Sequence, residues 1–235
     1  MSRPLLAVRM TWHDLAFLHW PVDAERLRPH VPAGLEIETH GGSAWLGVVP
    51  FRMTDVGPRA LPPLPGISAF PELNVRTYVA HGGRRGVWFF SLDAGDRVTV
   101  RVARRLFHLP YYDARMSCER RGDAVDYRSV RTHRGQPPLA FRGRYRPVGD
   151  VSPARDGSLE EFLTNRTCLF AVDRAGGLHR GDVAHDSWPL QPAEAEIEEN
   201  SMARPLGLRL DTRPASVLFS RRLPVLAAPL VREQP

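Results

Sequence analysis

The sequence predicts a mainly β protein with a few short helices. Three observations favour this fold class: turn signals recur at short intervals, the runs between them are rich in β-branched and aromatic residues, and convincing helical segments are few. At 235 residues, with 43% hydrophobic and 25% charged residues, the chain can bury a sizeable core. Because no linker or internal repeat interrupts it, we expect one domain over residues 1–235.

Two segments are typical of β-hairpins. The first has strands at residues 35–39 and 44–53, joined by a turn at Gly41 and Gly42. The second is ELNVRTYVAHGGRRGVWFFSLD, with its turn at residues 81–86. These hairpins predict an antiparallel sheet or barrel. Further strands are predicted at residues 111–119, 125–132, 139–146, 167–173, 193–198 and 216–222.

Two short helices have recognisable start signals. Asp23 is a candidate N-cap for a helix that Pro32 stops, and Ser158 precedes Glu161 by three residues, as in a capping box. The proline-rich segment at residues 56–71 is too poor in backbone donors for a central strand, so we expect a surface loop or lid there.

Residues 95–107, GDRVTVRVARRLF, fit two structures. Alternating valines suit a strand, whereas Val98, Val102 and Leu106 share one face of a helix, with arginines opposite. We favour the helix because Asp96 can cap it.

Charge and hydropathy limit the partners. The net charge is +6 and the sequence pI about 10.1, but the basic residues are spread along the chain among 26 acidic ones, which does not favour nucleic-acid binding. No apolar run approaches the ~18 residues of a membrane span, and Arg9 and His13 interrupt any signal-peptide core. We therefore expect a cytoplasmic protein, with Cys118 and Cys168 reduced.

All 32 basic residues are arginine, and the chain contains no lysine. Arginine stays protonated near neutral pH and cannot act as an amine nucleophile, so the N-terminus is the one primary amine of this sequence. The common nucleotide, zinc-protease and serine-hydrolase motifs are absent. The pair His13 and His19 and the pair His179 and His185 have spacings that do not indicate a metal site, so we expect neither metal nor cofactor.

The strand that begins near Glu72 carries an unusual polar face. Because side chains alternate along a strand, Glu72, Asn74, Arg76 and Tyr78 lie on one face and apolar residues on the other. A polar row of this kind either lines a cavity that binds a charged ligand or faces solvent on a half-buried strand.

The chain also resembles a known family, the YqjF-like family of unknown function. The resemblance runs from about residue 12 to residue 220 and rests on TWHDLAFLHWPV, GSAWLGVVPFRM, FPELNVRTYV, GVWFFSLDA, ARRLFHLPYYDARM and LHRGDVAHDSWPL. That family is in turn similar in fold to acetoacetate decarboxylase. The resemblance therefore implies a closed antiparallel β-barrel with a central cavity.

The resemblance also excludes one mechanism. In acetoacetate decarboxylases an arginine begins a stretch that leads through a glycine, an aromatic residue and a proline to paired lysines, the first of which forms the Schiff base. On this chain the arginine falls on Arg104, the proline on Pro110 and the two lysines on Tyr111 and Tyr112. The nucleophile is missing, so a lysine Schiff base is not implied.

The same resemblance places Glu72 at a cavity glutamate. We expect Glu72 to act as a base and a phenol of Tyr111 or Tyr112 to stabilise an oxyanion; only one of the two can face inward, and we favour Tyr111. Arg76 or Arg104 suits a carboxylate. The alternatives are that each arginine pairs with an acid and that the tyrosines pack in the barrel wall. The other substrate-binding candidates are Asn74, Tyr112 and His185.

Two functions fit these expectations. The first is an enzyme, of lyase, hydratase or isomerase type, that acts on a small keto acid or related carboxylate by proton transfer. The alternative is a β-barrel that binds or senses a small molecule without turning it over. In both cases the expected partner is a small carboxylate, and the sequence leaves a homo-oligomer open.

Overall fold

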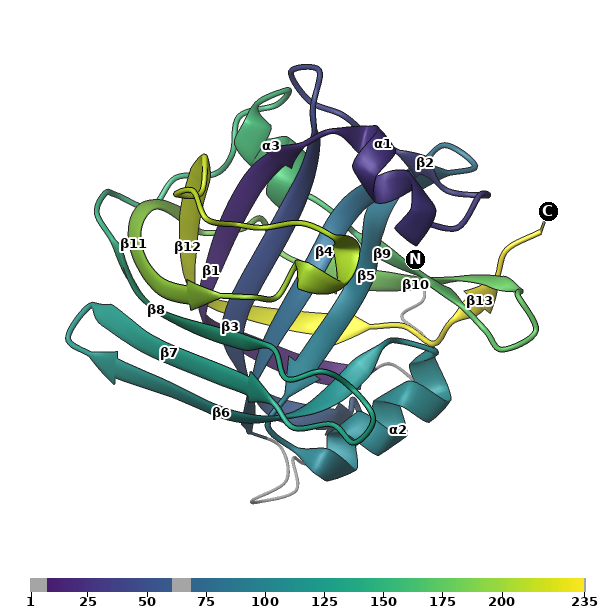
Figure 1. Ribbon diagram of the computed structural model, residues 1–235, viewed down its shortest axis with the longest axis horizontal. Coiled ribbons are helices and arrows are strands. Elements are labelled where there is room, and N and C mark those ends of the chain that lie inside the picture. The colour runs from purple at the N-terminus through teal and green to yellow at the C-terminus, as the bar shows by residue number, and fades with distance from the viewer. Residues whose placement is uncertain (1–7, 61–68, 235) are drawn as a thin grey trace.

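An antiparallel sheet of long strands forms the centre of the fold (Figure 1). The protein's structure is a computed structural model that describes residues 8–60 and 69–234. In this sheet each strand pairs with its neighbours in antiparallel register. Its strands, in spatial order, are β12 (Ser216–Ala227), β1 (Val8–Val22), β3 (Ala44–Pro58), β4 (Phe70–His81) and β5 (Arg84–Ala94).

Two separate sets of hydrogen-bonded strands connect β5 with β12, the outermost strands of this sheet. One path closes a barrel of nine strands through β6 (Tyr111–Arg121), β7 (Ala124–Arg131), β8 (Ala140–Pro147) and β11 (Leu190–Asn200). A shorter path runs through β9 (Cys168–Val172) and β10 (Leu178–His185). The predicted closed barrel is confirmed. Pairing in this barrel is antiparallel except where β6 runs parallel to β5, and on the shorter path β9 also runs parallel to β5.

The helices are short and lie outside the sheet (Figure 1). The Asp23 carboxylate caps the first of them, and Ser158 Oγ accepts from Glu161 N at 3.2 Å at the start of the third. The helix favoured over the strand at residues 95–107 is confirmed. The helices are α1 (Ala24–Leu27), α2 (Arg97–Phe107), α3 (Leu159–Thr164) and the 3-10 turns η1 (Arg28–His30) and η2 (Arg204–Leu206). Among the described residues, no helix is long and apolar enough to cross a membrane.

One predicted hairpin is wrong and the other is confirmed. The short strand β2 (Glu36–Ile37) pairs with β4, and one isolated bridge, His40 to Ser43, joins the turn to the start of β3. Both edges of β3 are already occupied by the longer strands β1 and β4. The second hairpin forms as expected between β4 and β5.

Strand β1 was not predicted as a strand, although it lies at the centre of the sheet. Its residues 14–20 are buried on both faces, so it lacks the alternation that identifies a half-buried strand. Asp14, with a φ of 50°, and a register shift between His13 and Leu18 interrupt it further. Strand β10 and the short strand β13 (Val231–Arg232) were also missed.

The central sheet separates two apolar cores. On one face, Leu73 and Val75 of β4 pack with aromatic residues of β7 and β8, among them Tyr127. On the other face lies a core built mainly from strands of the shorter circuit, among them β1, β3, β5, β9 and β12, together with Tyr111 and Trp188. The alternation of β4 turns Glu72, Asn74, Arg76 and Tyr78 to the face of this second core, where Tyr78 packs in a separate cluster with Phe162 and Leu163. The centre of the proline-rich segment, residues 61–68, lies outside the described residues.

Candidate active site inside the shorter circuit

Glu72 and Tyr111 form a buried pair at one end of the second core. Glu72 stands on β4 between Phe51 of β3 and Ala94 of β5, and Tyr111 is the first residue of β6. Their side chains are hydrogen-bonded to each other, and the residues are 2% and 8% exposed. The second carboxyl oxygen of Glu72, Oε2, has no partner among the described residues. The two predicted catalytic residues are therefore in contact.

Burial changes the acidity of both groups. Desolvation raises the pKa of Glu72 to about 8; the hydrogen bond with Tyr111 opposes this rise and the charge of Asp93 adds to it. Desolvation and the neighbouring Glu72 raise the pKa of the Tyr111 phenol well above 10. Near neutral pH the phenol stays a hydrogen-bond donor, while Glu72 can exchange its proton close to the working pH of an enzyme.

The rest of the β4 polar row, defined as Glu72, Asn74, Arg76 and Tyr78, is also turned inward. Asn74 is 5% exposed and its Oδ1 lacks a partner in the described part of the chain. The half-buried Arg76 donates from Nη2 to the Leu163 carbonyl at 3.3 Å, and its guanidinium lies 5.3 Å from the ring centroid of Phe17. Burial excludes the alternative of a solvent-facing row for Glu72 and Asn74.

Sequence reasoning missed His19, which lies beside this row. It is fully buried on β1, and its Nε2 lies 2.5 Å from Tyr78 Oη, which donates to the Leu163 carbonyl at 2.8 Å. Burial, and then the charge of Arg76, lower the pKa of His19 well below its usual value. Because β1 shows no alternation in the sequence, no signal placed this histidine on an inward face.

His185 lies with two tryptophans. Trp12 and Trp188 are stacked at 5.6 Å between centroids, and His185 meets Trp188 edge-on at 5.2 Å. Both indole Nε1 groups are buried without a partner among the described residues. His185 itself is half-buried, and its Nδ1 contacts the backbone oxygen of Asp186 at 2.7 Å. The structure thus places His185 in an aromatic cluster that adjoins the second core, where Trp12 also meets Phe51, the residue opposite Glu72.

Arg104 and Tyr112 line a surface cleft of about 1320 Å³ between α2 and the turn after β9. Arg104 is exposed, and its Nη1 donates to the Tyr111 carbonyl at 3.1 Å. The Tyr112 ring lies 4.1 Å from the guanidinium carbon of the buried Arg131, which pairs with Asp93 at 2.8 Å. The side chains of Arg104 and Tyr112 therefore lie at this surface cleft, whereas the Tyr111 side chain points inward. For Tyr111 and Tyr112 this difference is expected, because they are neighbours on a strand.

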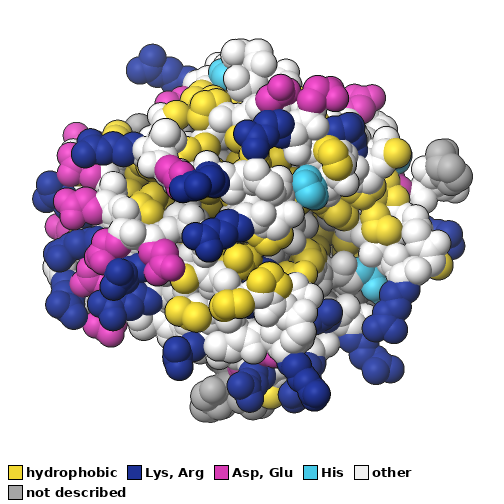
Figure 2. Space-filling model, in the orientation of Figure 1, with side chains coloured by type: hydrophobic (Ala, Val, Ile, Leu, Met, Phe, Trp, Pro, Cys, Tyr) yellow, Lys and Arg dark blue, Asp and Glu magenta, His cyan; other side chains and the backbone are white. Residues whose placement is uncertain are grey.

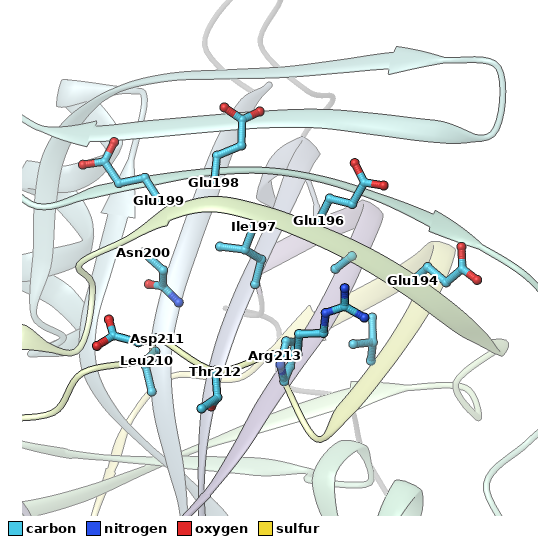
Figure 3. Close-up of a pocket in the computed structure, with 13 residues that line it drawn as sticks. Glu194, Glu196, Ile197, Glu198, Glu199, Asn200, Leu210, Asp211, Thr212 and Arg213 are labelled. Atoms are coloured by element: carbon cyan, nitrogen blue, oxygen red, sulfur yellow. The ribbon is translucent and has the colours of Figure 1, made fainter.

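A second groove, of about 780 Å³, lies between β11 and residues 210–214 (Figure 3). Glu194, Glu196 and Glu198 point away from it, whereas Ile197 points toward it (Figure 3). Glu194 and Glu198 pair with arginines of β8 at 3.1 and 3.0 Å. Within the described residues, no group of three or more histidine, cysteine or acidic side chains could hold a metal ion. None of the predicted site residues lies in this groove.

The surface charge is mixed. On the face in Figure 2, arginines and acidic side chains stand side by side along one flank, and hydrophobic side chains reach the surface near the centre. Ion pairs between neighbouring strands, such as Arg142 with Glu198, account for part of this pattern.

Solved structures share this fold. An acetoacetate decarboxylase-like enzyme from Sphingomonas wittichii RW1 matches with a TM-score of 0.65 and 16% identity over 99% of this chain and 94% of that one. Acetoacetate decarboxylase from Legionella pneumophila gives 0.63 and 13% over 97% and 87%. The enduracididine biosynthesis enzyme MppR complexed with pyruvate gives 0.64 and 11% over 99% and 91%. At these identities the likeness shows the acetoacetate decarboxylase-like fold alone.

Sequence comparison finds a relative of higher identity than these solved structures. The uncharacterized protein YqjF of Bacillus subtilis (strain 168) is 43% identical over 223 residues, which cover 95% of this chain and 91% of that protein. The family model DUF2071, described as an uncharacterized conserved protein, matches residues 9–224. The chain therefore belongs to the DUF2071 family.

Proposed function

We propose that this protein is an enzyme of lyase, hydratase or isomerase type that acts on a small keto acid or related carboxylate by proton transfer, without an imine intermediate. The observation that carries the proposal is the buried Glu72 and Tyr111 pair, in which Oε2 of Glu72 lacks a partner among the described residues. A carboxyl group whose pKa is raised to about 8 can both accept and return a proton near neutral pH.

The proposed step conserves every proton. Ionised Glu72 removes a proton from the carbon next to the keto group, and the electrons of that C–H bond form the enolate. The Tyr111 phenol turns from Glu72 to the enolate oxygen and donates a hydrogen bond to it. Protonated Glu72 then returns its proton to carbon or to a neighbouring atom. General acid–base catalysis of this kind contributes roughly 10²–10⁴-fold in rate.

Two further residues of the β4 polar row support a carboxylate substrate. Arg76 carries a charge that no acidic side chain of the described residues neutralises, and a guanidinium matches a carboxylate with parallel donors. Asn74 stands between Glu72 and Arg76 and has an unpartnered Oδ1. In this proposal Arg76 binds the carboxylate, and Asn74 orients the chain of the substrate between Arg76 and Glu72.

Two other observations favour a keto acid and exclude an imine on a lysine side chain. The similar MppR structure is described as a complex with pyruvate, a 2-keto acid, and we carry that substrate class over to this chain as part of the proposal. The absence of lysine removes the side chain that would form an imine with a keto group.

Deuterium exchange tests the proposal. The protein is incubated in D₂O with pyruvate, 2-oxobutyrate or 4-oxopentanoate, and loss of the proton signal next to the keto group is followed by NMR. We expect exchange with at least one acid, a rate that rises as pH passes about 8, and at least a 100-fold loss in Glu72→Gln and Tyr111→Phe. The control is Tyr145→Phe, which removes a buried phenol from the opposite core.

The outcomes separate the candidate functions. Full exchange in folded Tyr111→Phe would remove the phenol from the mechanism. Binding of these acids without exchange by the wild-type protein would overturn the enzyme and favour the non-catalytic barrel. Thermal melting of each variant checks that it is folded.

A further inference from the structure

The surface cleft of about 1320 Å³ lies where two strands leave the same edge of β5. Val87 and Trp88 of β5 pair with β9, and from Leu92 onward β5 pairs with β6. Among the described residues, no strand pairs with residues 89–91 on this edge. Phe90 is also the extra residue of a β-bulge against β4. The cleft therefore lies over a stretch of β5 whose edge the sheet leaves open.

Two segments form walls of this cleft. One is α2 with the residues that follow it, and the other is the turn after β9, residues 172–175. His108, directly after α2, has a φ of 50°, and its ring lies 5.3 Å from the ring of His179. His179 Nε2 in turn lies 2.9 Å from Asp173 Oδ2, in the second wall. Side-chain contacts therefore hold the two walls together.

Aromatic side chains line the cleft along β5. Trp88, Phe89 and Phe90 all line it and are half-buried, so part of each remains accessible. The Trp88 indole is held by a hydrogen bond from Nε1 to the His30 carbonyl at 3.0 Å. The His30 imidazole also lines the cleft and meets the Phe90 ring edge-on, at 6.5 Å between centroids. Partly exposed aromatic rings of this kind can stack with a flat ring of a ligand.

The cleft carries more positive than negative charge. Its arginines come from both walls: Arg101, Arg104 and Arg105 from α2, and Arg174 from the turn after β9. None of the four forms an ion pair within residues 8–60 and 69–234. The carboxylates that line the cleft, those of Asp113 and Asp173, lie 3.0 and 2.9 Å from histidine nitrogens. This excess of unpaired guanidinium groups favours an anionic ligand.

Arg104 is held in a defined orientation. Its Nη1 donates to the Tyr111 carbonyl at 3.1 Å and to His133 Nε2 at 2.7 Å, and Asp113 holds His133 in turn at 3.0 Å. These bonds use both hydrogens of Nη1. The other N–H groups of the guanidinium, on Nε and Nη2, have no partner in the described part of the chain. They form one edge of an exposed guanidinium, and such an edge matches two oxygens of a phosphate.

We propose that this cleft binds an organic phosphate that carries an aromatic ring, the chemistry of a nucleotide, with the phosphates on the arginines and the ring against Trp88 and Phe90. A carboxylate carries one charge, which one guanidinium matches, whereas four unpaired guanidiniums match the several charges of a diphosphate. The volume exceeds the roughly 300–1000 Å³ of typical ligand pockets, so a ligand of this size fits. Neither Glu72 nor Tyr111 lines the cleft, so this site is separate from that of the proposed function.

Calorimetric titrations at pH 7 and low salt test the proposal with ADP, UDP, adenosine and pyrophosphate as probes. We expect at least one nucleoside diphosphate to bind, and adenosine and pyrophosphate to bind about 10-fold or more weakly, because each lacks one part of the ligand. Arg104→Gln and Arg174→Gln should each weaken binding of that diphosphate by about 5-fold or more. Phe90→Leu should weaken it without changing the affinity for pyrophosphate. The matched control is Arg97→Gln, which removes an exposed charge from α2 outside the cleft and should bind as the wild type does.

A second measurement locates the ligand without any variant. In ¹⁵N-labelled wild-type protein, the amide signals of residues 101–105 and 173–175 should shift when the bound diphosphate is added. Failure of both diphosphates to bind, or binding of pyrophosphate as tightly as either of them, would overturn the proposal. Equal losses of affinity in Arg97→Gln and Arg104→Gln, or unchanged amide signals in both segments, would also overturn it.

Discussion

Glu72 illustrates how burial can reverse the usual pH dependence of a carboxyl group. In the folded protein its pKa is raised to about 8, whereas the ordinary value is 4.5. Between these values the folded protein holds a proton that the unfolded chain releases, so the free energy of unfolding falls as the pH rises. The stabilisation is complete below pH 4.5 and is lost as the pH passes about 8.

Glu72→Gln should remove this dependence. We expect the free energy of unfolding of the wild-type protein to fall by about 4 kcal/mol more than that of the variant between pH 5 and 9. Urea denaturation at several pH values measures the difference. Glu199→Gln, at an exposed position, is the control and should follow the wild type. Parallel pH curves for wild type and Glu72→Gln would show that Glu72 is not buried as described.

Tyr112 is held by packing against a cation. Its ring lies 4.1 Å from the guanidinium carbon of Arg131, which is buried and paired with Asp93. Desolvated contacts of this kind are worth about 2 kcal/mol. Tyr112→Leu should therefore lose about 2 kcal/mol in urea denaturation, whereas Tyr112→Phe, which keeps the ring, should lose less than about 0.5 kcal/mol. Equal stability of the two variants would speak against the contact.

The sequence could place only part of the candidate site. Alternation along β4 correctly grouped Glu72, Asn74 and Arg76 on one face, because a strand with an apolar opposite face has a readable period of two. Arg104 could not be placed in the same way, since it lies on a helix whose orientation depends on tertiary packing. His19 was missed because both faces of its strand are buried.

At the level of elements, Gly86 allows β5 and β9 to pair. A Cβ there would stand 2.8 Å from the carbonyl oxygen and the sulfur of Cys168 and 2.9 Å from the Phe170 ring. Gly86→Ala should destabilise the protein by about 1–3 kcal/mol through overpacking, as measured by urea denaturation. Gly34→Ala is the matched control, because nothing lies within 4 Å of its Cβ position. A folded Gly86→Ala as stable as the control would show that β5 and β9 are less closely packed.

The elements differ in how well local sequence predicts them. The hairpin of β4 and β5 was predicted because its glycine turn and its two arms are contiguous in sequence. The pairing of β2 with β4 was not predicted. Strands β1 and β4 occupy both edges of β3, and these pairings join segments that are distant in sequence. Local signals such as the Ser158 cap identify where a helix begins, but they carry no information on which strands become neighbours.

At the level of the whole molecule, the lack of lysine predicts a chemical property. Borohydride reduction in the presence of pyruvate or acetoacetate should add mass at the N-terminal amine alone. Mass spectrometry of the intact protein measures this, and a sample acetylated at its N-terminus should remain unmodified. Reduction of a keto acid onto any internal residue would show an imine chemistry that this sequence does not predict.

The overall architecture was predicted mainly through the resemblance to a known family. Periodicity alone indicated an antiparallel sheet or barrel, whereas barrel closure depends on contacts such as those of β5 with β6 and β9, between strands far apart in the chain. Strand β5 pairs with β9 as well as β6, and β12 pairs with β10 as well as β11; these extra pairings create the second circuit that encloses the β4 polar row. No local sequence pattern predicts them.

The acidity of Glu72 tests the central claim most directly. Carboxyl-labelled [¹³C]glutamate is incorporated, and the Glu72 signal, assigned by its loss in Glu72→Gln, is followed from pH 3 to pH 10. A buried carboxyl paired with Tyr111 should titrate with a pKa of about 8. A midpoint near the ordinary value of 4.5 would place Glu72 in water and contradict the site built around it.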